Sequence, residues 1–391
     1  MIESPIFTPF QLNSIQLKNR IIKSATYEGL CKNNSVSDRL IEWHRKIIQG
    51  GTAMTTLAYC AVSNEGATFD NQIVLRKEII PDLKKFTTAM HEVGGLASIQ
   101  LAHCGFFSKN KKLAKKPISP SSTFNKLGLF SGIPFSKTMT EEDLDRTIEE
   151  YTNAALIAKE SGFDAVEIHC GHGYLLSQFL SPAFNKRTDE YGGSIEKRLR
   201  FPVEVIQSVR LCVGEDFPIL VKMNLSDGFK GGLSLNEAKH VASTFEKAGV
   251  DALILSGGLT SVNAFYLLRG DVPLKQMIQV ESNWMQKIGV MLFGPFVIKK
   301  ERFTELFFLK MAEKIRKVVS IPLIYIGGVT SLNNMEEVLS RGFNLIALGR
   351  PLIHDSNFIN GLQSGAITET GCTYCNQCIP EIDRGGVRCV I

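Results

Sequence analysis

The chain has 391 residues, of which 44% are hydrophobic and 21% charged, and its formal net charge is +5 at pH 7. This composition is typical of a globular protein and excludes a disordered or polyelectrolyte chain. Residues 109–116 form the only basic cluster, which favours a solvated loop over a nucleic-acid site. No apolar run reaches membrane-spanning length, and the N-terminus lacks a secretion-signal pattern. We therefore expect a cytoplasmic protein with a small-molecule substrate and with neither nucleic acid nor membrane as partner.

Short apolar runs alternate with helical patterns along the chain. The runs are nearly continuous in apolar residues, which is typical of strands buried on both faces. They lie at residues 20–24, 53–59, 96–101, 165–169, 219–223, 252–255, 323–326 and 345–348. Helical patterns occupy residues 39–49, 81–93, 140–162, 195–213, 236–248, 302–319 and 333–341. This alternation predicts an α/β fold, a (β/α)8 TIM barrel. A doubly wound sheet competes with it, but no G-x-G-x-x-G motif follows an early strand.

Two long βα loop insertions interrupt the alternation. Residues 104–137 are expected to form a loop or a small hairpin after the third strand. Residues 260–300, which carry Trp284, Phe293 and Phe296, follow the sixth strand. Because long βα loops surround the mouth of a barrel, we expect both insertions to shape a pocket there.

The fourth apolar run ends in His169, and His172 and Tyr174 follow directly. The carboxyl ends of barrel strands are where catalytic side chains gather. The two histidines could bind a metal, bond neighbouring loops, or donate to a ligand oxygen that gains charge. We expect Glu167 on the opposite strand face, which leaves a metal without a third ligand and favours the last interpretation. Tyr174, with an ordinary phenol pKa near 10, suits proton donation, although a core tyrosine is the alternative.

Glycines and cations follow the last two strands. Gly327 and Gly328 come after the seventh strand, and Gly349 and Arg350 after the eighth. Loops at these two places bind phosphate in many barrels. Lys222 ends the fifth strand and is expected to point into the same mouth. The pattern predicts a phosphorylated ligand.

Several segments resemble the Old Yellow Enzyme family of NADH:flavin oxidoreductases. The longest is EIHCGHGYLLSQFLSPAFNKRTDEYGGSIEKRLRF, at residues 167–201. The family's first-strand motif is matched by LKNRIIKSAT, its third-strand motif by QLAHCG, and the loop after that strand by PISPSS. Its phosphate-binding segments after the last two strands are matched by IGGVTS and LIALGRPLIHD. The resemblance covers about residues 6–364.

The resemblance implies an FMN-dependent enzyme that uses NADH or NADPH to reduce an activated C=C bond, such as that of an α,β-unsaturated carbonyl. It implies that His169 and His172 bond the substrate's carbonyl oxygen and that Tyr174 donates the proton. The residues that it assigns to FMN are Ser24, Ala25, Thr26, Tyr59, Gln100, Lys222, Gly327, Gly328, Gly349 and Arg350. Two positions depart from the family pattern: Tyr27 stands where Thr or Cys is frequent, and Lys222 where Arg is usual.

The chain closes with a cysteine-rich tail at residues 371–391, after a barrel domain predicted for residues 1–370. Its cysteines are Cys372, Cys375, Cys378 and Cys389. They resemble the [4Fe-4S] ligands of 2,4-dienoyl-CoA reductase relatives, with one residue fewer between the second and third. A Zn²⁺ site and reduced thiols remain open as well.

Two other functions compete with the reductase. One is a redox- or metal-sensing flavin-binding protein that uses the tail cysteines, and the other is a barrel enzyme without flavin, such as an aldolase. The natural substrate, the choice between NADH and NADPH, and assembly into a homo-oligomer are left open.

Overall fold

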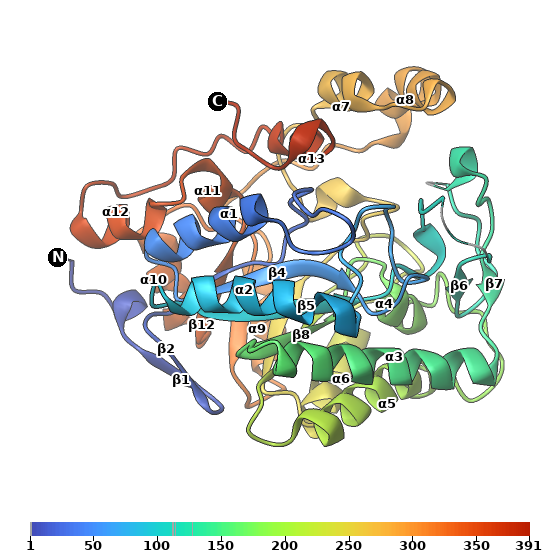
Figure 1. Cartoon of the computed structure of the whole chain (residues 1–391), viewed down its shortest axis with the longest axis horizontal. Helices are drawn as coiled ribbons and strands as arrows, with labels where there is room; N and C mark the ends of the chain where they lie inside the picture. Colours follow the sequence, from blue (N-terminus) through green and yellow to red (C-terminus); the bar gives the residue numbers. More distant parts are fainter. Residues whose placement is uncertain (1, 112, 114, 127) are drawn as a thin grey trace.

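The computed structural model describes residues 2–111, 113, 115–126 and 128–391, and its centre is a closed barrel of strands ringed by helices (Figure 1). Neighbouring strands of the barrel are parallel throughout. In spatial order they are β3 (Ile21–Lys23), β4 (Met54–Ala61), β5 (Leu96–Ala102), β8 (Ala165–Cys170), β9 (Ile219–Asn224), β10 (Ala252–Ser256), β11 (Leu323–Tyr325) and β12 (Leu345–Leu348). The predicted (β/α)8 barrel is confirmed, and each strand end lies within two residues of its predicted run.

The outer helices are α1 (Asp38–Gln49), α2 (Ile80–His91), α3 (Glu141–Glu160), α5 (Ile195–Val213), α6 (Leu235–Lys247), α9 (Leu309–Arg316) and α10 (Leu332–Ser340). The start of α3 shows why the sequence predicts them well. The Thr140 hydroxyl accepts a hydrogen bond from the Asp143 N–H at 3.2 Å, and the Asp143 carboxylate accepts one from the Thr140 N–H at 3.1 Å. This reciprocal pair satisfies two backbone donors that the first helical turn leaves open.

The helix predicted for residues 302–319 is shorter than expected. It begins only at Leu309, because Leu306 has a left-handed φ of 50° that an α-helix does not accommodate. The Leu306 N–H instead donates to the Gly328 carbonyl oxygen at 2.9 Å. The segment before α9 therefore lies along the loop after β11 and borders the barrel mouth.

An N-terminal hairpin closes the bottom of the barrel. Its strands, β1 (Phe10–Leu12) and β2 (Ile15–Leu17), are antiparallel. Leu12 and Leu17 are buried in one cluster with inward residues of the barrel strands, such as Ile324. This end is therefore plugged by apolar side chains, whereas a cavity opens at the carboxyl ends of the strands.

The first insertion is a long loop that contains a small hairpin: Phe124 and Phe135 pair antiparallel, and the Asn125 N–H donates to the Pro134 carbonyl oxygen at 2.9 Å. Two short strands, β6 (Ile118–Ser119) and β7 (Lys137–Thr138), flank this hairpin and run parallel to each other. Part of this insertion (residues 112, 114 and 127) lies outside the described residues. The second insertion contains α7 (Leu274–Val280) and α8 (Trp284–Val297). Among the described residues, no helix combines the length and apolarity needed to cross a bilayer.

Candidate active site

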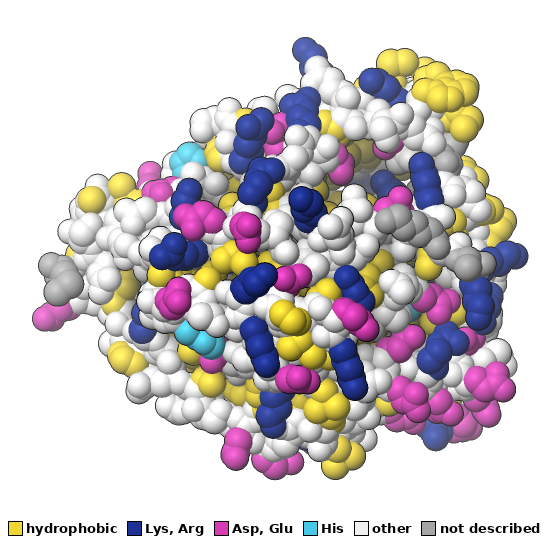
Figure 2. All heavy atoms as spheres, viewed as in Figure 1, with side chains coloured by type: hydrophobic (Ala, Val, Ile, Leu, Met, Phe, Trp, Pro, Cys, Tyr) yellow, Lys and Arg dark blue, Asp and Glu magenta, His cyan; other side chains and the backbone are white. Residues whose placement is uncertain are grey.

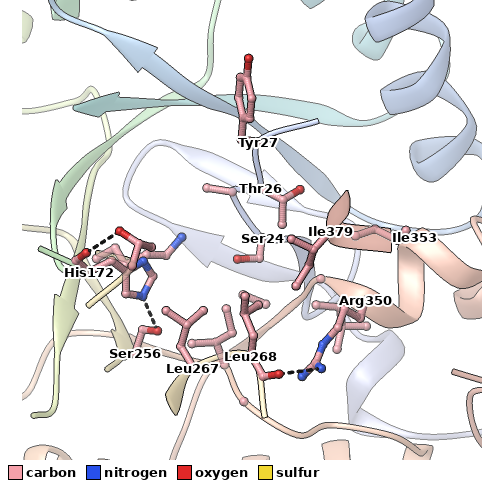
Figure 3. A pocket seen from close by; sticks show the side chains of 18 of the residues that line it. Ser24, Thr26, Tyr27, His172, Ser256, Leu267, Leu268, Arg350, Ile353 and Ile379 are labelled. Carbon is pink, nitrogen blue, oxygen red and sulfur yellow. Dashed lines mark hydrogen bonds between the residues drawn. The ribbon is translucent and has the colours of Figure 1, made fainter. Parts of the chain in front are cut away.

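A cavity of about 330 Å³ opens at the carboxyl ends of the barrel strands. Every residue predicted from the sequence to be catalytic or to bind the cofactor lines it: Ser24, Ala25, Thr26, Tyr59, Gln100, His169, His172, Tyr174, Lys222, Gly327, Gly328, Gly349 and Arg350. Figure 3 shows His172 with Ser256 on one side of this cavity and Arg350 on another. With Ser256 at the end of β10, the barrel gathers residues from all eight of its strand ends around one space.

The end of β8 supplies one face of the cavity. The ring centroids of His169 and His172 lie 4.9 Å apart with the rings perpendicular, and the Tyr174 ring lies 4.3 Å from that of His169. His172 has a left-handed φ of 57°, which turns the chain sharply after the strand. Its carbonyl oxygen accepts hydrogen bonds from the N–H and the hydroxyl of Thr260, both at 3.0 Å. The loop after β10 therefore holds the histidine loop in place.

The three side chains keep defined protonation states at physiological pH. Burial, with a contribution from the Lys222 charge, lowers the pKa of His172 to about 3 and that of His169 well below its ordinary value. Burial also raises the pKa of Tyr174 above that of a free phenol. Both imidazoles are therefore neutral and the phenol keeps its proton.

Hydrogen bonds orient the two imidazoles. The Gly171 N–H donates to His169 Nδ1 at 3.3 Å, which assigns the ring proton of neutral His169 to Nε2. His172 Nε2 lies 2.7 Å from the Ser256 hydroxyl oxygen, and its backbone N–H donates to Asn224 Oδ1 at 3.0 Å. Ser256 also lines the cavity; it directly follows the sixth predicted strand but was not among the predicted site residues.

Glu167 organises the floor of the cavity, and the expectation that it lies on the opposite strand face was wrong. Residues two apart on a strand share a face, so Glu167 points inward as His169 does. Its Oε1 lies 2.8 Å from Lys222 Nζ and accepts a hydrogen bond from Gln100 Nε2 at 2.5 Å. One buried carboxylate thus fixes two polar groups that face the cavity.

The end of β3 borders the cavity through Ser24, Ala25 and Thr26. The Thr26 hydroxyl donates to Glu28 Oε1 at 2.6 Å, and Lys23 Nζ pairs with the same oxygen. Lys23 and Glu28 are both buried, and Lys23 holds the pKa of Glu28 below its usual range despite that burial. This buried pair positions the strand end from behind.

Tyr59 meets the cavity with its ring and not with its hydroxyl group. Its hydroxyl oxygen pairs with the Thr68 hydroxyl and accepts a hydrogen bond from the Thr68 N–H at 3.1 Å. Its ring packs edge to face against Tyr174, with centroids 4.7 Å apart. A ligand would therefore meet an aromatic surface at this position.

The predicted phosphate-binding end lies at β11 and β12. Gly328 has a φ of +72°, and an added Cβ would lie 2.7 Å from the Thr304 carbonyl oxygen, so the close turn requires glycine. Arg350 donates from Nη1 to the Arg269 carbonyl and to Asn376 Oδ1, both at 2.7 Å. These bonds hold the guanidinium at the cavity wall.

The cysteine tail forms part of the cavity wall, which the sequence analysis missed. Tyr374, Cys378, Ile379, Ile382 and Val387 all line the cavity. Ile379 and Ile382 belong to α13 (Cys378–Gly385), and their spacing of three residues was a local signal of an apolar helix face. The division at residue 370 stays a prediction.

The four tail cysteines surround a second, small cavity of about 20 Å³, together with His354. His354 Nδ1 lies 3.3 Å from Cys389 Sγ, and burial raises the pKa of Cys378 to about 11. Within the described part of the chain, no group of three or more His, Cys, Asp or Glu is placed to hold a metal ion. Cys378 lines both cavities, so the two spaces share a wall.

The sequence matches the NADH:flavin oxidoreductase / NADH oxidase family over residues 5–264. It is 37% identical over 389 residues to the 4,4'-dithiodibutanoate disulfide reductase of Rhodococcus erythropolis, covering 99% of this chain and 94% of that protein. It is 30% identical to the metal reductase of Desulforamulus reducens, covering 97% of this chain but only 52% of that longer protein.

The fold resembles that of the old yellow enzyme homologue from Zymomonas mobilis. The TM-score is 0.74 at 19% identity, and the match covers 95% of this chain and 96% of that one. At this identity the likeness concerns the fold alone. The sequence matches and the barrel together show that the chain is an oxidoreductase that belongs to the NADH:flavin oxidoreductase family, the Old Yellow Enzyme family.

Proposed function

We propose that this enzyme holds FMN across the barrel mouth and uses NADH or NADPH to reduce a carbon–carbon double bond conjugated to a carbonyl or similar group. The observation that carries the proposal is the arrangement of His169, His172 and Tyr174 on one face of a cavity that Arg350 borders elsewhere. Neutral hydrogen-bond donors and a protonated phenol are the groups that this reaction needs.

The cavity fits FMN. Its volume of about 330 Å³ is that of a small-molecule site. An added Cβ at Gly349 would meet only the Thr26 methyl group, at 3.8 Å, so this backbone borders open space. Gln100 and Lys222 offer donors to a polar ring edge, and Arg350 offers a fixed cation to a phosphate. When bound, FMN would supply the hydride-transfer chemistry between the nicotinamide and the substrate.

In this proposal each side chain has one task. His169 Nε2–H and the His172 imidazole hydrogen-bond the substrate oxygen and stabilise the negative charge that develops there. Tyr174 donates its phenolic proton to the carbon next to the carbonyl, and the raised pKa keeps that proton available at neutral pH. The walls from α13 exclude water from the reacting atoms.

Disulfides are a second candidate substrate class, because a disulfide reductase is 37% identical over nearly the whole chain. Reduction of a disulfide by NAD(P)H consumes one proton and yields two thiols. Thiolates leave without a proton donor at neutral pH far more readily than a carbanion forms. Tyr174 is therefore not needed for that reaction, which separates the two candidates.

The deciding experiment measures NADH and NADPH oxidation without oxygen against cyclohexenone and against 4,4'-dithiodibutanoate. Flavin absorption of the purified protein, or its appearance on FMN addition, is recorded first. Flavin with enone turnover supports the proposal, and turnover of the disulfide alone supports the second candidate. A protein that binds no FMN overturns both and leaves a barrel enzyme without flavin.

We propose for the tail that its four cysteines, which line one small cavity, hold an iron–sulfur cluster or a zinc ion, or remain reduced thiols. Iron and zinc assays on protein purified without oxygen test this. A second test replaces Cys372 and Cys375 by Ser. If this variant loses the metal but keeps its reductase turnover, the result argues against the metal-sensing alternative.

A further inference from the structure

We propose that the hairpin of α7 and α8 docks on the surface of an anionic lipid bilayer. The two helices stand out from the barrel beyond α13, at the top of the view in Figure 1. Hydrophobic side chains gather at the same corner of the space-filling view in Figure 2. α8 has 14 residues, and Gly294 is its one buried position.

The apolar side chains of α8 are exposed to an unusual degree. The exposed fractions are 68% for Trp284, 44% for Met285, 43% for Ile288, 54% for Met291, 55% for Leu292, 63% for Phe293, 83% for Phe296 and 62% for Val297. The three aromatic residues alone expose on the order of 400 Å². An apolar segment of 10–14 residues is either a core helix or an interfacial one, and this exposure excludes the core.

The charge of the hairpin indicates what covers it. Residues 272–300 carry four lysines, Lys275, Lys287, Lys299 and Lys300, and one acid, Glu281. Lys300 pairs with Asp271 at 2.6 Å, just outside this range. Helices that lie in a membrane surface combine Trp, Phe and Leu with lysines that contact anionic headgroups. The hairpin has this combination, with the aromatic residues at both ends of α8.

A second copy of the chain fits the hairpin less well. In a two-fold dimer the same patch faces itself, so the lysines of one copy would oppose those of the other. Anionic headgroups instead complement them. This proposal departs from the expectation of no membrane partner, and it requires no spanning helix.

The hairpin is joined to the wall of the active-site cavity. Arg384 Nη2 of α13 donates to Gln279 Oε1 of α7 at 2.9 Å. Leu267 and Leu268, which precede α7 in the second insertion, line the cavity themselves. A docked hairpin would therefore hold the mouth close to the bilayer. The proposal does not depend on which bond the enzyme reduces.

Vesicle flotation of the full chain tests the proposal. Vesicles of phosphatidylcholine alone are compared with vesicles that contain a quarter phosphatidylglycerol, in low and high salt. We expect flotation with the anionic vesicles and its loss in high salt. The double change Trp284→Ser and Phe296→Ser should lower the bound fraction about tenfold or more. The matched control, Leu211→Ser with Leu156→Ser, changes side chains that are 86% and 43% exposed on α5 and α3 and should bind as the wild type does.

The charge contribution has its own pair of variants. Lys287→Gln with Lys299→Gln should weaken binding about fivefold per lysine. The control change, Lys77→Gln with Lys84→Gln, removes two exposed lysines just before and within α2 and should not weaken binding. Flotation that is absent, or equal in all variants, overturns the proposal. A wild-type dimer that the α8 variants convert to a monomer, without flotation of either, overturns it too and assigns the face to a second copy.

Discussion

Tyr174 shows how the functional behaviour of one residue follows from its neighbours. Its ring lies among those of Tyr59, Phe107 and His169, with centroid distances of 4.7, 5.0 and 4.3 Å. This aromatic and buried environment disfavours the phenolate, so the pKa is raised and the group stays an acid.

Replacement of Tyr174 by Phe should therefore leave flavin reduction by NAD(P)H unchanged but slow enone reduction about 10²- to 10⁴-fold, because general acid catalysis is lost. Stopped-flow measurement of the two half-reactions checks this. Disulfide reduction by the same variant should remain near the wild-type rate. An equal loss in both half-reactions would mean that the ring positions the flavin and does not donate a proton.

Glu167 is the second residue whose contacts lead to a prediction. Replacement by Gln leaves the Lys222 ammonium buried without its counter-charge, since the pair is 2% and 1% exposed. Loss of one partner of a buried pair costs roughly 3–5 kcal/mol of unfolding free energy. Chemical denaturation of the apoprotein checks this value. The double change Glu167→Gln and Lys222→Met should recover much of the loss, and no recovery would contradict a charge-pair explanation.

At the scale of elements, hydrogen bonds hold the cysteine tail against the second insertion. The Asn376 side chain donates to the Leu268 carbonyl at 2.6 Å and to the Asp271 carbonyl at 2.9 Å. The Asp271 N–H donates in turn to the Tyr374 carbonyl oxygen at 3.1 Å. These hydrogen bonds hold α13 over the cavity. They run between loop residues of the tail and of the second insertion, and not between paired strands or within one helix.

Gly270 allows this close approach and can be used to test it. Its φ is +132°, and an added Cβ would lie 2.1 Å from the Tyr374 carbonyl oxygen. Gly270→Ala should displace the tail and raise the rate at which a thiol reagent modifies the tail cysteines, while the barrel still folds. Gly385→Ala is a control, because nothing lies within 4 Å of its added Cβ, although its φ is also positive, at +125°. Equal thiol reactivity in both variants would contradict the proposal that the contact at Gly270 holds the tail in place.

For the whole molecule, buried neutral histidines connect stability to pH. His44 and His103 are fully buried, and burial lowers their pKa values to about 4 and about 3. An unfolded chain titrates its histidines near pH 6.5. Below that pH the unfolded state binds protons that the folded state does not, so stability falls as pH falls.

The free energy of unfolding should therefore decrease between pH 6.5 and 4.5 by up to about 1.4 kcal/mol per pH unit for each of these histidines. Denaturation with guanidinium at several pH values measures the slope. In His44→Gln the slope should be smaller by the contribution of one histidine, whatever the stability at pH 7. A slope that is the same in both proteins would exclude His44 as a source.

Much of the fold and of the site follows from local sequence patterns. Each barrel strand is a continuous apolar run, and the start of α3 carries its own capping residues, so both were predicted within a few residues. The cavity residues were predicted because strand ends in a barrel converge by topology. Their assigned roles stay predictions.

Contacts between distant segments had no such local signal. The tail's place over the cavity depends on hydrogen bonds between residues more than 100 positions apart, such as Asn376 and Leu268. The parallel pairing of β6 and β7 and the bond between Glu167 and Gln100 likewise join segments that the sequence keeps apart. The sequence by itself thus determined the barrel and the residues that line its cavity, because continuous apolar runs alternate with helical patterns and the strand ends of such a barrel converge. Only the tertiary structure decided what closes the cavity and which charges support it, because those depend on how separate loops meet in space.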